Sequence, residues 1–320
     1  MSAPHETPPP QSATAKRAAE VTRRNEAAAE RTVGEIRGDL AWHSAIWCQL
    51  SLPYRAKPDQ VIFERTNGGR TLKILAEPGT MPRGVYDRRF LLWMSNAAHE
   101  QQSRQLTLDN ADIVDFFRSV TSGEGARTRL RQNERNRIES AVRRLFGAHL
   151  TLVDRTDPTR ERGGAMRIVS QYDLWLGGDA GAKALWDSSV TLSEEYADSI
   201  RGHAVPVDRA LLRAVGKSAE GIDVATWLPW RVHPSVLHTP TRISWAALLD
   251  QFGQQKATVR NARLSLKQHI EEVASFYEAA GHQPFVTVTE QGLKLRPLEL
   301  LPGVRPKTTI QFKLTPAISL

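Results

Sequence analysis

The feature that most constrains this chain is an arginine-rich stretch over residues 123–146, which has the pattern of one long amphipathic helix. At 100° per residue its apolar residues gather on one side of the helix. These are Leu130, Ile138, Ala141, Val142 and Leu145. The basic and polar candidates for ligand contact, most of them on the opposite side, are Arg127, Arg129, Gln132, Asn133, Asn136, Ser140 and Arg143. Guanidinium groups pair with phosphate or guanine and amides pair with adenine, so the pattern predicts a helix that reads the major groove of DNA.

A second interpretation of this stretch stays open at this point. Glu124, Glu134 and Glu139 are interleaved with the arginines, so the helix could instead be a solvated one that is held by i,i+4 ion pairs. An isolated basic helix more often faces water than a ligand. The choice between the two interpretations depends on the rest of the chain.

The charge balance favours a polyanionic partner. The 320 residues carry 43 Lys and Arg against 35 Asp and Glu, a net charge of +8, and nucleic acid is the usual partner of such a chain. This length predicts about two domains. No apolar run approaches the roughly 18–20 residues that span a bilayer, and the N-terminus has no hydrophobic signal segment, so we expect no membrane partner. The single cysteine, Cys48, predicts a reducing, cytoplasmic setting.

The first half is expected to form an N-terminal extension and one mixed domain. The extension spans 1–40 and contains a disordered, Pro-rich segment followed by helix formers, and the domain spans 41–176. Asn67-Gly68-Gly69 predicts a hairpin turn, and Asp109 predicts a helix N-cap. The expected strands cover 45–52, 60–65, 70–75, 149–154 and 166–172, and the expected helices cover 88–99, 109–120 and the arginine-rich stretch.

The order of helix, helix, long helix and β-hairpin in this domain is that of a winged helix. Between the last two strands, residues 155–164 have the composition of a turn-rich loop that carries Arg155, Arg160 and Arg162. Basic residues at the tip of a wing suit the minor groove or flanking phosphates. A mobile surface loop is the alternative interpretation of the same residues.

The second half repeats this plan after a glycine-rich linker at 177–183. Its domain spans 177–300, and residues 301–320 form a C-terminal tail. The predicted fold class is therefore α+β, with tandem winged-helix domains behind a disordered or helical N-terminal extension. The expected elements of the second domain are short strands over 190–196 and around His203, helices over 206–216, 222–232, 244–252 and 256–277, and a final hairpin over 284–296.

The long helix at 256–277 is the second candidate for DNA contact. Its expected apolar stripe consists of Val259, Ala262, Leu266, Ile270, Val273 and Tyr277, a spacing typical of a helix. The polar residues expected to face outward are Lys256, Arg260, Asn261, Ser265, Lys267 and Gln268. Leu264 also lies on the outward side, so a protein interface is the alternative for this helix. Two basic long helices that each precede a hairpin favour DNA binding over the solvated-helix interpretation.

Short motifs between residues 52 and 297 also carry a family resemblance. They are Leu52-Pro53-Tyr54-Arg55, Arg65-Thr66-Asn67-Gly68-Gly69, Pro82-Arg83-Gly84, Leu91-Leu92-Trp93, His203-Ala204-Val205-Pro206-Val207, Ile222-Asp223-Val224-Ala225-Thr226-Trp227-Leu228, Arg231, Ile243-Ser244-Trp245-Ala246-Ala247-Leu248, Gln251-Phe252-Gly253 and Gln291-Gly292-Leu293-Lys294-Leu295-Arg296-Pro297. Together they resemble the plasmid RepA replication-initiator family. The chain departs from that family's pattern at Asn96-Ala97-Ala98, where an acidic segment is usual, and at Gly123-Glu124-Gly125, where adjacent glycines are usual.

The resemblance implies an initiator that binds repeated sites (iterons) at a plasmid origin, helps to open the duplex and recruits host replication machinery. The partners that it implies are double-stranded DNA at the origin repeats and a host initiator or helicase, and it leaves a homodimer open. Tandem winged-helix domains are the fold that it implies. The alternative function is a sequence-specific transcriptional regulator that represses its own gene, because both functions need sequence-specific binding to a duplex.

The sequence contains no motif that predicts catalysis. A single cysteine excludes a cysteine-rich zinc site, and the sequence has neither the His-x-His motif of a rolling-circle nickase nor a Ser-His-Asp pattern. We therefore expect a protein that is not an enzyme and that needs no cofactor or metal. A nuclease or strand-transfer enzyme is the third hypothesis, which metal-dependent nicking of supercoiled DNA would support.

Overall fold

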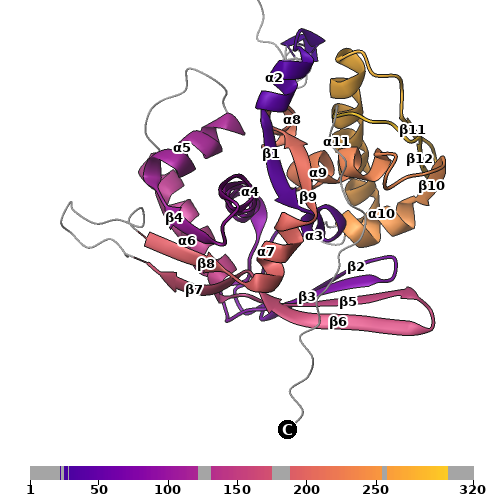
Figure 1. Ribbon diagram of the computed structural model, residues 1–320. Helices are drawn as coiled ribbons and strands as arrows, with labels where there is room; N and C mark the ends of the chain where they lie inside the picture. The colour runs from indigo at the N-terminus through magenta and orange to yellow at the C-terminus, as the bar shows by residue number, and fades with distance from the viewer. Residues whose placement is uncertain are drawn as a thin grey trace, which may run out of the picture.

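Two buried helices form the centre of the protein in a computed structural model that describes residues 22, 25–27, 29–121, 131–174, 188–253 and 258–301. They are α4 (Gly84–Gln101) from the first half and α9 (Ala219–Val232) from the second half. Every residue of α9 except Arg231 is buried. Figure 1 shows α5 and α6 on one side of this centre and α11 on the other. The core residues of the two halves form one continuous cluster.

The other helices and the strands surround this centre. Among these helices, α6 and α11 are the longest, with 16 and 21 residues. The helices are α2 (Val33–Gly38), α3 (Ala45–Gln49), α5 (Asn110–Ser119), α6 (Gln132–Gly147), α7 (Glu194–Arg201), α8 (Arg209–Val215), α10 (Trp245–Phe252) and α11 (Val259–Ala279). The strands are β1 (Leu40–Ser44), β2 (Ile62–Asn67), β3 (Arg70–Leu75), β4 (Gln105–Leu108), β5 (His149–Asp157), β6 (Arg160–Arg167), β7 (Val169–Asp173), β8 (Ser188–Leu192), β9 (Ala204–Asp208), β10 (Thr241–Ser244), β11 (Val286–Val288) and β12 (Gly292–Leu295).

The strands form small antiparallel sheets. In the part of the chain that the structure describes, their orders are β1-β9, β2-β3-β5-β6, β4-β8-β7 and β10-β12-β11. In the four-stranded sheet, Leu72 and Ile74 of β3 and Leu150 and Leu152 of β5 are buried against the core. The side chains between them on the same strands point to the other face, because neighbouring residues of a strand alternate between faces.

Two of these sheets join strands from the two expected domains. Strand β1 pairs with β9. Strand β8, which follows the expected boundary at residues 176 and 177, pairs with both β4 and β7. Strand pairing therefore does not separate the chain at that boundary.

Buried polar side chains also connect the two halves. Arg88 on α4 donates two hydrogen bonds to Asp223 on α9, over 2.7 and 2.8 Å, and both side chains are buried. Arg65 on β2 donates to the carbonyl oxygen of Gln251 on α10 at 2.6 Å. Buried charges are tolerated when they are paired and hydrogen-bonded. This cluster therefore fixes α4 and β2 against α9 and α10.

The expected helices α4, α5, α9, α10 and α11 are confirmed within a few residues at their ends. The arginine-rich helix is confirmed as α6, but it begins at Gln132, after an extended N-cap residue, and not at residue 123. Asp109 caps α5, because its carboxylate accepts hydrogen bonds from two N–H groups in the first turn. The hairpin turn after Asn67 is also confirmed, since Asn67 pairs with Arg70 across it. Gly68 has a φ of 57° in this turn, a conformation that glycine adopts without strain.

The strand expected over residues 45–52 is wrong. Residues Ala45–Gln49 form helix α3 instead, and the hydroxyl of Ser44 accepts a hydrogen bond from the N–H of Ile46 at its start. All five residues of α3 are buried. A short, fully buried apolar run has no periodicity that distinguishes a helix from a strand.

Three further expected elements differ from the structure. The turn-rich loop expected over 155–164 is mostly strand, because β5 continues to Asp157 and β6 begins at Arg160. The hairpin adds to the β2–β3 sheet, because β5 pairs with β3 and its buried Leu150 and Leu152 lie opposite the buried Ile74 and Leu72. Residues 194–196 belong to α7 rather than to a strand, and residues 206–208 belong to β9 rather than to the helix that follows.

Candidate nucleic-acid interface

Helix α6 packs its apolar face against α4 and presents a polar face to solvent. Its buried residues are Ile138, Ala141, Val142, Leu145 and Phe146. The candidate contacts that lie exposed on it are Gln132, Asn133, Asn136, Ser140 and Arg143. The expected orientation of this helix is confirmed. Its amide and guanidinium groups lie where a duplex can reach them.

Hydrogen bonds organise the exposed face of α6. Gln132 Nε2 donates to Asn136 Oδ1 at 2.9 Å, and the Ser140 hydroxyl donates to the Asn136 carbonyl oxygen at 2.7 Å. Among the described residues, no arginine of α6 forms an ion pair with Glu134 or Glu139; the ion pair of this helix is with a residue of α4. The i,i+4 ion pairs of the solvated-helix interpretation are therefore not formed in this part of the helix.

That ion pair fixes α6 to the first turn of α4. Arg144 donates two hydrogen bonds to Asp87, from Nε at 2.9 Å and from Nη2 at 2.5 Å. Asp87 is fully buried and also accepts from the N–H of Arg83 at 3.0 Å. Three donors satisfy the buried carboxylate, so α6 is held in one position against α4.

The tip of the β5–β6 hairpin carries as many acidic as basic side chains. The basic residues are Arg155, Arg160 and Arg162, here called the hairpin arginines, and the acidic ones are Asp154, Asp157 and Glu161. Arg155 donates to Glu161 at 2.6 Å, and both side chains are more than half exposed. The attraction of the hairpin arginines for a polyanion is thus partly offset within the hairpin.

Asp154 anchors this hairpin to β3. Its carboxylate accepts hydrogen bonds from Arg70 Nε at 2.9 Å and from the Thr156 hydroxyl at 2.5 Å. Partial burial raises the pKa of Asp154, but the hydrogen bonds from Thr156 and Arg70 outweigh this effect and lower the pKa to about 2. The carboxylate therefore stays ionised and keeps Arg70 in place at neutral pH.

Helix α11 exposes its first turns to solvent. Of its candidate contacts, Arg260, Asn261 and Gln268 are exposed and Lys267 is half-buried. Ser265 does not face outward as expected, because its hydroxyl donates a hydrogen bond to the carboxylate of Glu220 on α9. Lys267 forms an i,i+4 ion pair at 3.6 Å with Glu271, so its charge is partly neutralised on the helix itself.

The apolar stripe of α11 is shorter than expected. Val259 is 73% exposed, because it is the first residue of the helix and follows the N-cap Thr258. The stripe is buried from Ala262 onward. Leu264 is 55% exposed on the outward side, so the alternative of a protein interface stays open for this helix.

The candidate contacts are distributed over different parts of the molecule. Figure 1 shows α6 and α11 on opposite sides of the central helices, with the β5–β6 hairpin at the end of the four-stranded sheet. The remaining candidates, Arg127, Arg129 and Lys256, lie outside the described residues.

A basic groove beside α6 is a feature that no sequence pattern predicts. It has a volume of about 670 Å³ and lies between α6, the first turn of α4 and the segment before β2. Its arginines are Arg55, Arg83, Arg137 and Arg144. The family motifs contain the first two and the arginine-rich stretch contains the others, but no local pattern indicates that these segments meet.

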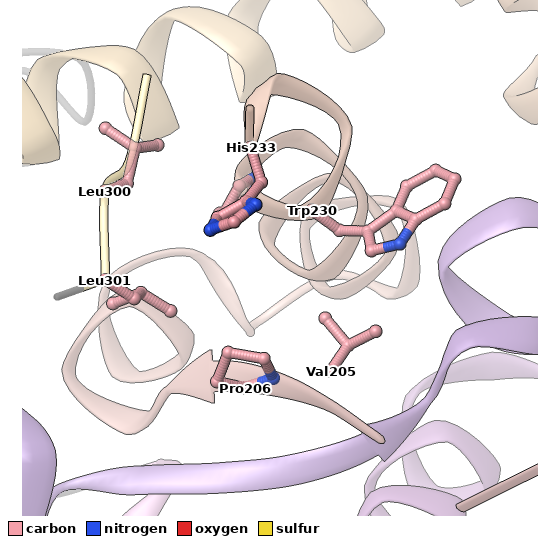
Figure 2. A pocket seen from close by; sticks show the side chains of 7 residues that line it. Val205, Pro206, Trp230, His233, Leu300 and Leu301 are labelled. Atoms are coloured by element: carbon pink, nitrogen blue, oxygen red, sulfur yellow. The ribbon is translucent and has the colours of Figure 1, made fainter. Parts of the chain in front are cut away.

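A second, enclosed pocket lies between β9, the end of α9 and the segment after β12 (Figure 2). Leu300 and Leu301 face Trp230 and His233 across it. Its volume is about 10 Å³, which is room for about one water molecule. We interpret it as a packing void and not as a ligand site.

Within the described ranges, no three His, Cys, Asp or Glu side chains are grouped so that they could hold a metal ion. Burial raises the pKa of the Cys48 thiol far above its usual value, which disfavours the reactive thiolate. Among the helices that the structure describes, none is both long enough and apolar enough to cross a bilayer.

Two solved structures of RctB resemble this fold. Selenomethionine derivatives of domains 2 and 3 of RctB give a TM-score of 0.50 at 10% identity, with 80% of this chain and 99% of that chain covered. A second structure of RctB domains 2–3 gives a TM-score of 0.43 at 9% identity, with 78% and 96% covered. At this identity, the first of these likenesses concerns the α+β fold alone. No curated protein matches the sequence.

A family model described as plasmid encoded RepA protein matches residues 81–244, which is more than half of the chain. The matched segment contains α4, α6, the β5–β6 hairpin and the Arg88–Asp223 ion pair. It therefore includes both the main candidate DNA-contacting helix and the buried ion pair that connects the two halves. The chain belongs to the family of plasmid-encoded RepA proteins, as its sequence motifs predicted.

Proposed function

We propose that this protein is a plasmid replication initiator that binds repeated sites at an origin, aids opening of the duplex and recruits host replication proteins. Membership of the RepA family supports the role in replication. The single structural observation that carries the DNA-binding part is α6, a docked helix that exposes three amide side chains and Arg143 on its outward face. The proposed action is binding rather than catalysis.

The proposal includes two winged-helix units. The second unit consists of α9, β10, α10, α11, β11 and β12, and the sheet order β10-β12-β11 supports it, because the strand between the helices pairs with the final hairpin. The first unit consists of α4, β4, α5, α6 and the strands that follow. In this unit the order β4-β8-β7 matches β10-β12-β11, so the β7–β8 hairpin takes the position of a wing, while the β5–β6 hairpin extends the β2–β3 sheet.

In the proposed complex, α6 enters the major groove. Asn133 and Asn136 are suited to pair with adenine, and Arg129, which lies outside the described residues, is suited to guanine. The hairpin arginines are proposed to contact phosphates or the minor groove. Helix α11 is the proposed second reader, about one helical turn away along the duplex.

Quantitative DNA binding tests this proposal. Fluorescence anisotropy should compare a duplex that carries direct repeats from the DNA beside the gene with a scrambled duplex of equal length and composition, at fixed salt. The expected result is binding to the repeats at least about 10³-fold tighter than to the scrambled duplex. Equal affinity for the two duplexes would contradict sequence-specific recognition.

Two further measurements separate this function from its alternatives. A plasmid that carries the repeats and no other origin should be maintained only when this protein is supplied; repression of the gene without plasmid maintenance would favour the regulator. Incubation with supercoiled DNA and Mg²⁺ should leave the DNA unnicked. Nicking that copurifies with the protein and is lost on substitution of one of its side chains would favour the nuclease hypothesis.

A further inference from the structure

The groove beside α6 concentrates positive charge from three separate segments. Arg55 precedes β2, Arg83 lies at the start of α4, and Arg137 and Arg144 come from α6. The groove is open to solvent, and its volume of about 670 Å³ is in the range of known ligand sites, roughly 300–1,000 Å³. Among its lining residues in the described chain there is no acidic one.

The charges of these arginines are not neutralised equally. Arg144 is paired with the buried Asp87. Arg83 instead donates to two backbone carbonyl oxygens of the preceding loop, at 3.3 and 3.0 Å, and the guanidinium carbon of Arg137 lies 5.5 Å from the centre of the Tyr86 ring. Carbonyl oxygens and an aromatic ring orient a guanidinium group without cancelling its formal charge. The groove therefore keeps a net positive charge.

The backbone of α4 adds to this positive potential. The groove wall includes residues 84–86, which form the first turn of this 18-residue helix. The N-terminal end of a helix carries partial positive charge and favours anions. A guanidinium group can donate two parallel hydrogen bonds to the oxygens of a phosphate, so arginines beside a helix N-terminus suit an anionic phosphate better than a neutral ligand.

We propose that this groove binds a phosphate group of the DNA backbone, next to the base pairs that α6 contacts. Ser140 supports the location, because it lines the groove and also lies on the exposed face of α6 beside Asn136. A helix in the major groove has a phosphate backbone along each flank, and Arg137 lies on the flank of α6 that borders the groove. The open shape admits a phosphate within a continuous strand. This inference rests on the proposed DNA binding by α6.

The experiment measures the salt dependence of DNA affinity for R137Q and for R55Q/R137Q. Each lost phosphate contact should reduce the slope of log affinity against log salt by about 0.9, which corresponds to about fivefold weaker binding at 0.15 M salt. The preference for the repeat duplex over the scrambled duplex should stay unchanged, because a phosphate contact carries no sequence information. R137K, which keeps the charge, should keep most of the slope.

The matched control is R104Q. Arg104 is also exposed, but it follows the far end of α4, about 27 Å along the helix axis from the groove. Equal changes in slope for R104Q and R137Q would show a general charge effect and would overturn the proposal. An unchanged slope for R137Q would also overturn it. If the wild-type protein does not distinguish the repeats from the scrambled duplex, the proposed sequence-specific function fails, whereas the slopes on any duplex still test the phosphate site.

A single neutral methylphosphonate, moved along the repeat duplex, identifies the source of the phosphate. At one position it should weaken binding of the wild-type protein about fivefold and should leave R137Q unaffected. If no position shows this coupling, and inorganic phosphate at constant ionic strength shifts the NMR signals of the groove residues in the free protein, then the ligand is a free phosphate and the assignment to DNA is wrong.

Discussion

Breaking the buried ion pair between Arg88 and Asp223 should destabilise the protein far more than breaking an exposed one. Arg88 is 4% exposed and Asp223 is 5% exposed. Besides the two bonds to Asp223, Arg88 donates to the carbonyl oxygens of Leu52, Pro53 and Gly84. In the variant R88M the carboxylate stays buried without its partner, which costs about 3–5 kcal/mol.

Asp223 should be at least as sensitive as Arg88. Its carboxylate faces a second buried cation, since Arg65 also acts on it electrostatically. D223N therefore leaves two buried arginines without their counterion. The double variant R88M/D223L removes both members of the pair and should cost less than the sum of the two single changes, because no lone carboxylate remains.

Urea unfolding followed by circular dichroism gives the free energy of unfolding for each variant. The control is E161Q, which breaks the exposed Arg155–Glu161 pair and should cost at most about 1 kcal/mol. R88K, which keeps a charge but loses the paired geometry, provides an intermediate variant if R88M does not fold. Single changes that cost less than about 1 kcal/mol, or a double variant that costs the full sum, would refute this reasoning.

Further predictions concern the candidate interface. N133A and N136A should each weaken binding to the specific duplex by about 1–3 kcal/mol and binding to random DNA much less; equal losses in anisotropy titrations would indicate phosphate contacts. Removing the hairpin arginines together should reduce the salt slope by at most about three phosphate equivalents, and an unchanged slope would exclude the hairpin from the interface. R260Q should weaken DNA binding without a change in oligomeric state, whereas L264A should not weaken it. If titration shows unchanged DNA affinity for R260Q and sedimentation shows a changed oligomeric state for L264A, α11 belongs to a protein interface. The pKa of Asp154 is about 2 in the folded protein against a usual 3.8, so its stabilisation is complete above pH 4 and is lost as the pH falls toward 2, by at most about 2 kcal/mol. D154N should not show this loss. If the free energy of unfolding falls equally with pH for D154N and the wild-type protein, the prediction is wrong.

The features that could be predicted from the sequence are the local ones. The apolar periodicity of α6 and α11 indicates which side of each helix is buried, since both helices are long enough to show it. The N-cap at Asp109 and the turn after Asn67 follow from side chains next to the backbone that they stabilise. The exposed residues of α6 could be predicted for the same reason.

The features that could not be predicted depend on contacts between distant segments. Strand β1 pairs with β9, and Leu40 lies opposite Asp208, but nothing in either strand indicates its partner. The basic groove has the same origin, because Arg55 and Arg83 approach α6 only through the packing of α4. Helix α3 was missed for a different reason: at five residues it is too short to show a period.

These pairings change how the two proposed DNA-binding units can be tested. A fragment that ends at residue 176 lacks β8 and β9, so it would leave β4 without its partner and β1 without its own. It also lacks Asp223, so Arg88 would lose the counterion that fixes α4 in the whole protein. A failure of this fragment to bind DNA would therefore report lost folding and not the absence of a second reader.

Single substitutions in the whole chain avoid this problem, because Asn133 and Arg260 are exposed and take no part in the buried Arg88–Asp223 ion pair. If α6 and α11 both contact DNA, they occupy different positions along the duplex, since they lie on opposite sides of the central helices (Figure 1). Footprints of N133A and R260Q should then lose protection at different ends of the site. If α11 is a protein interface, R260Q should keep the full footprint and only N133A should lose part of it.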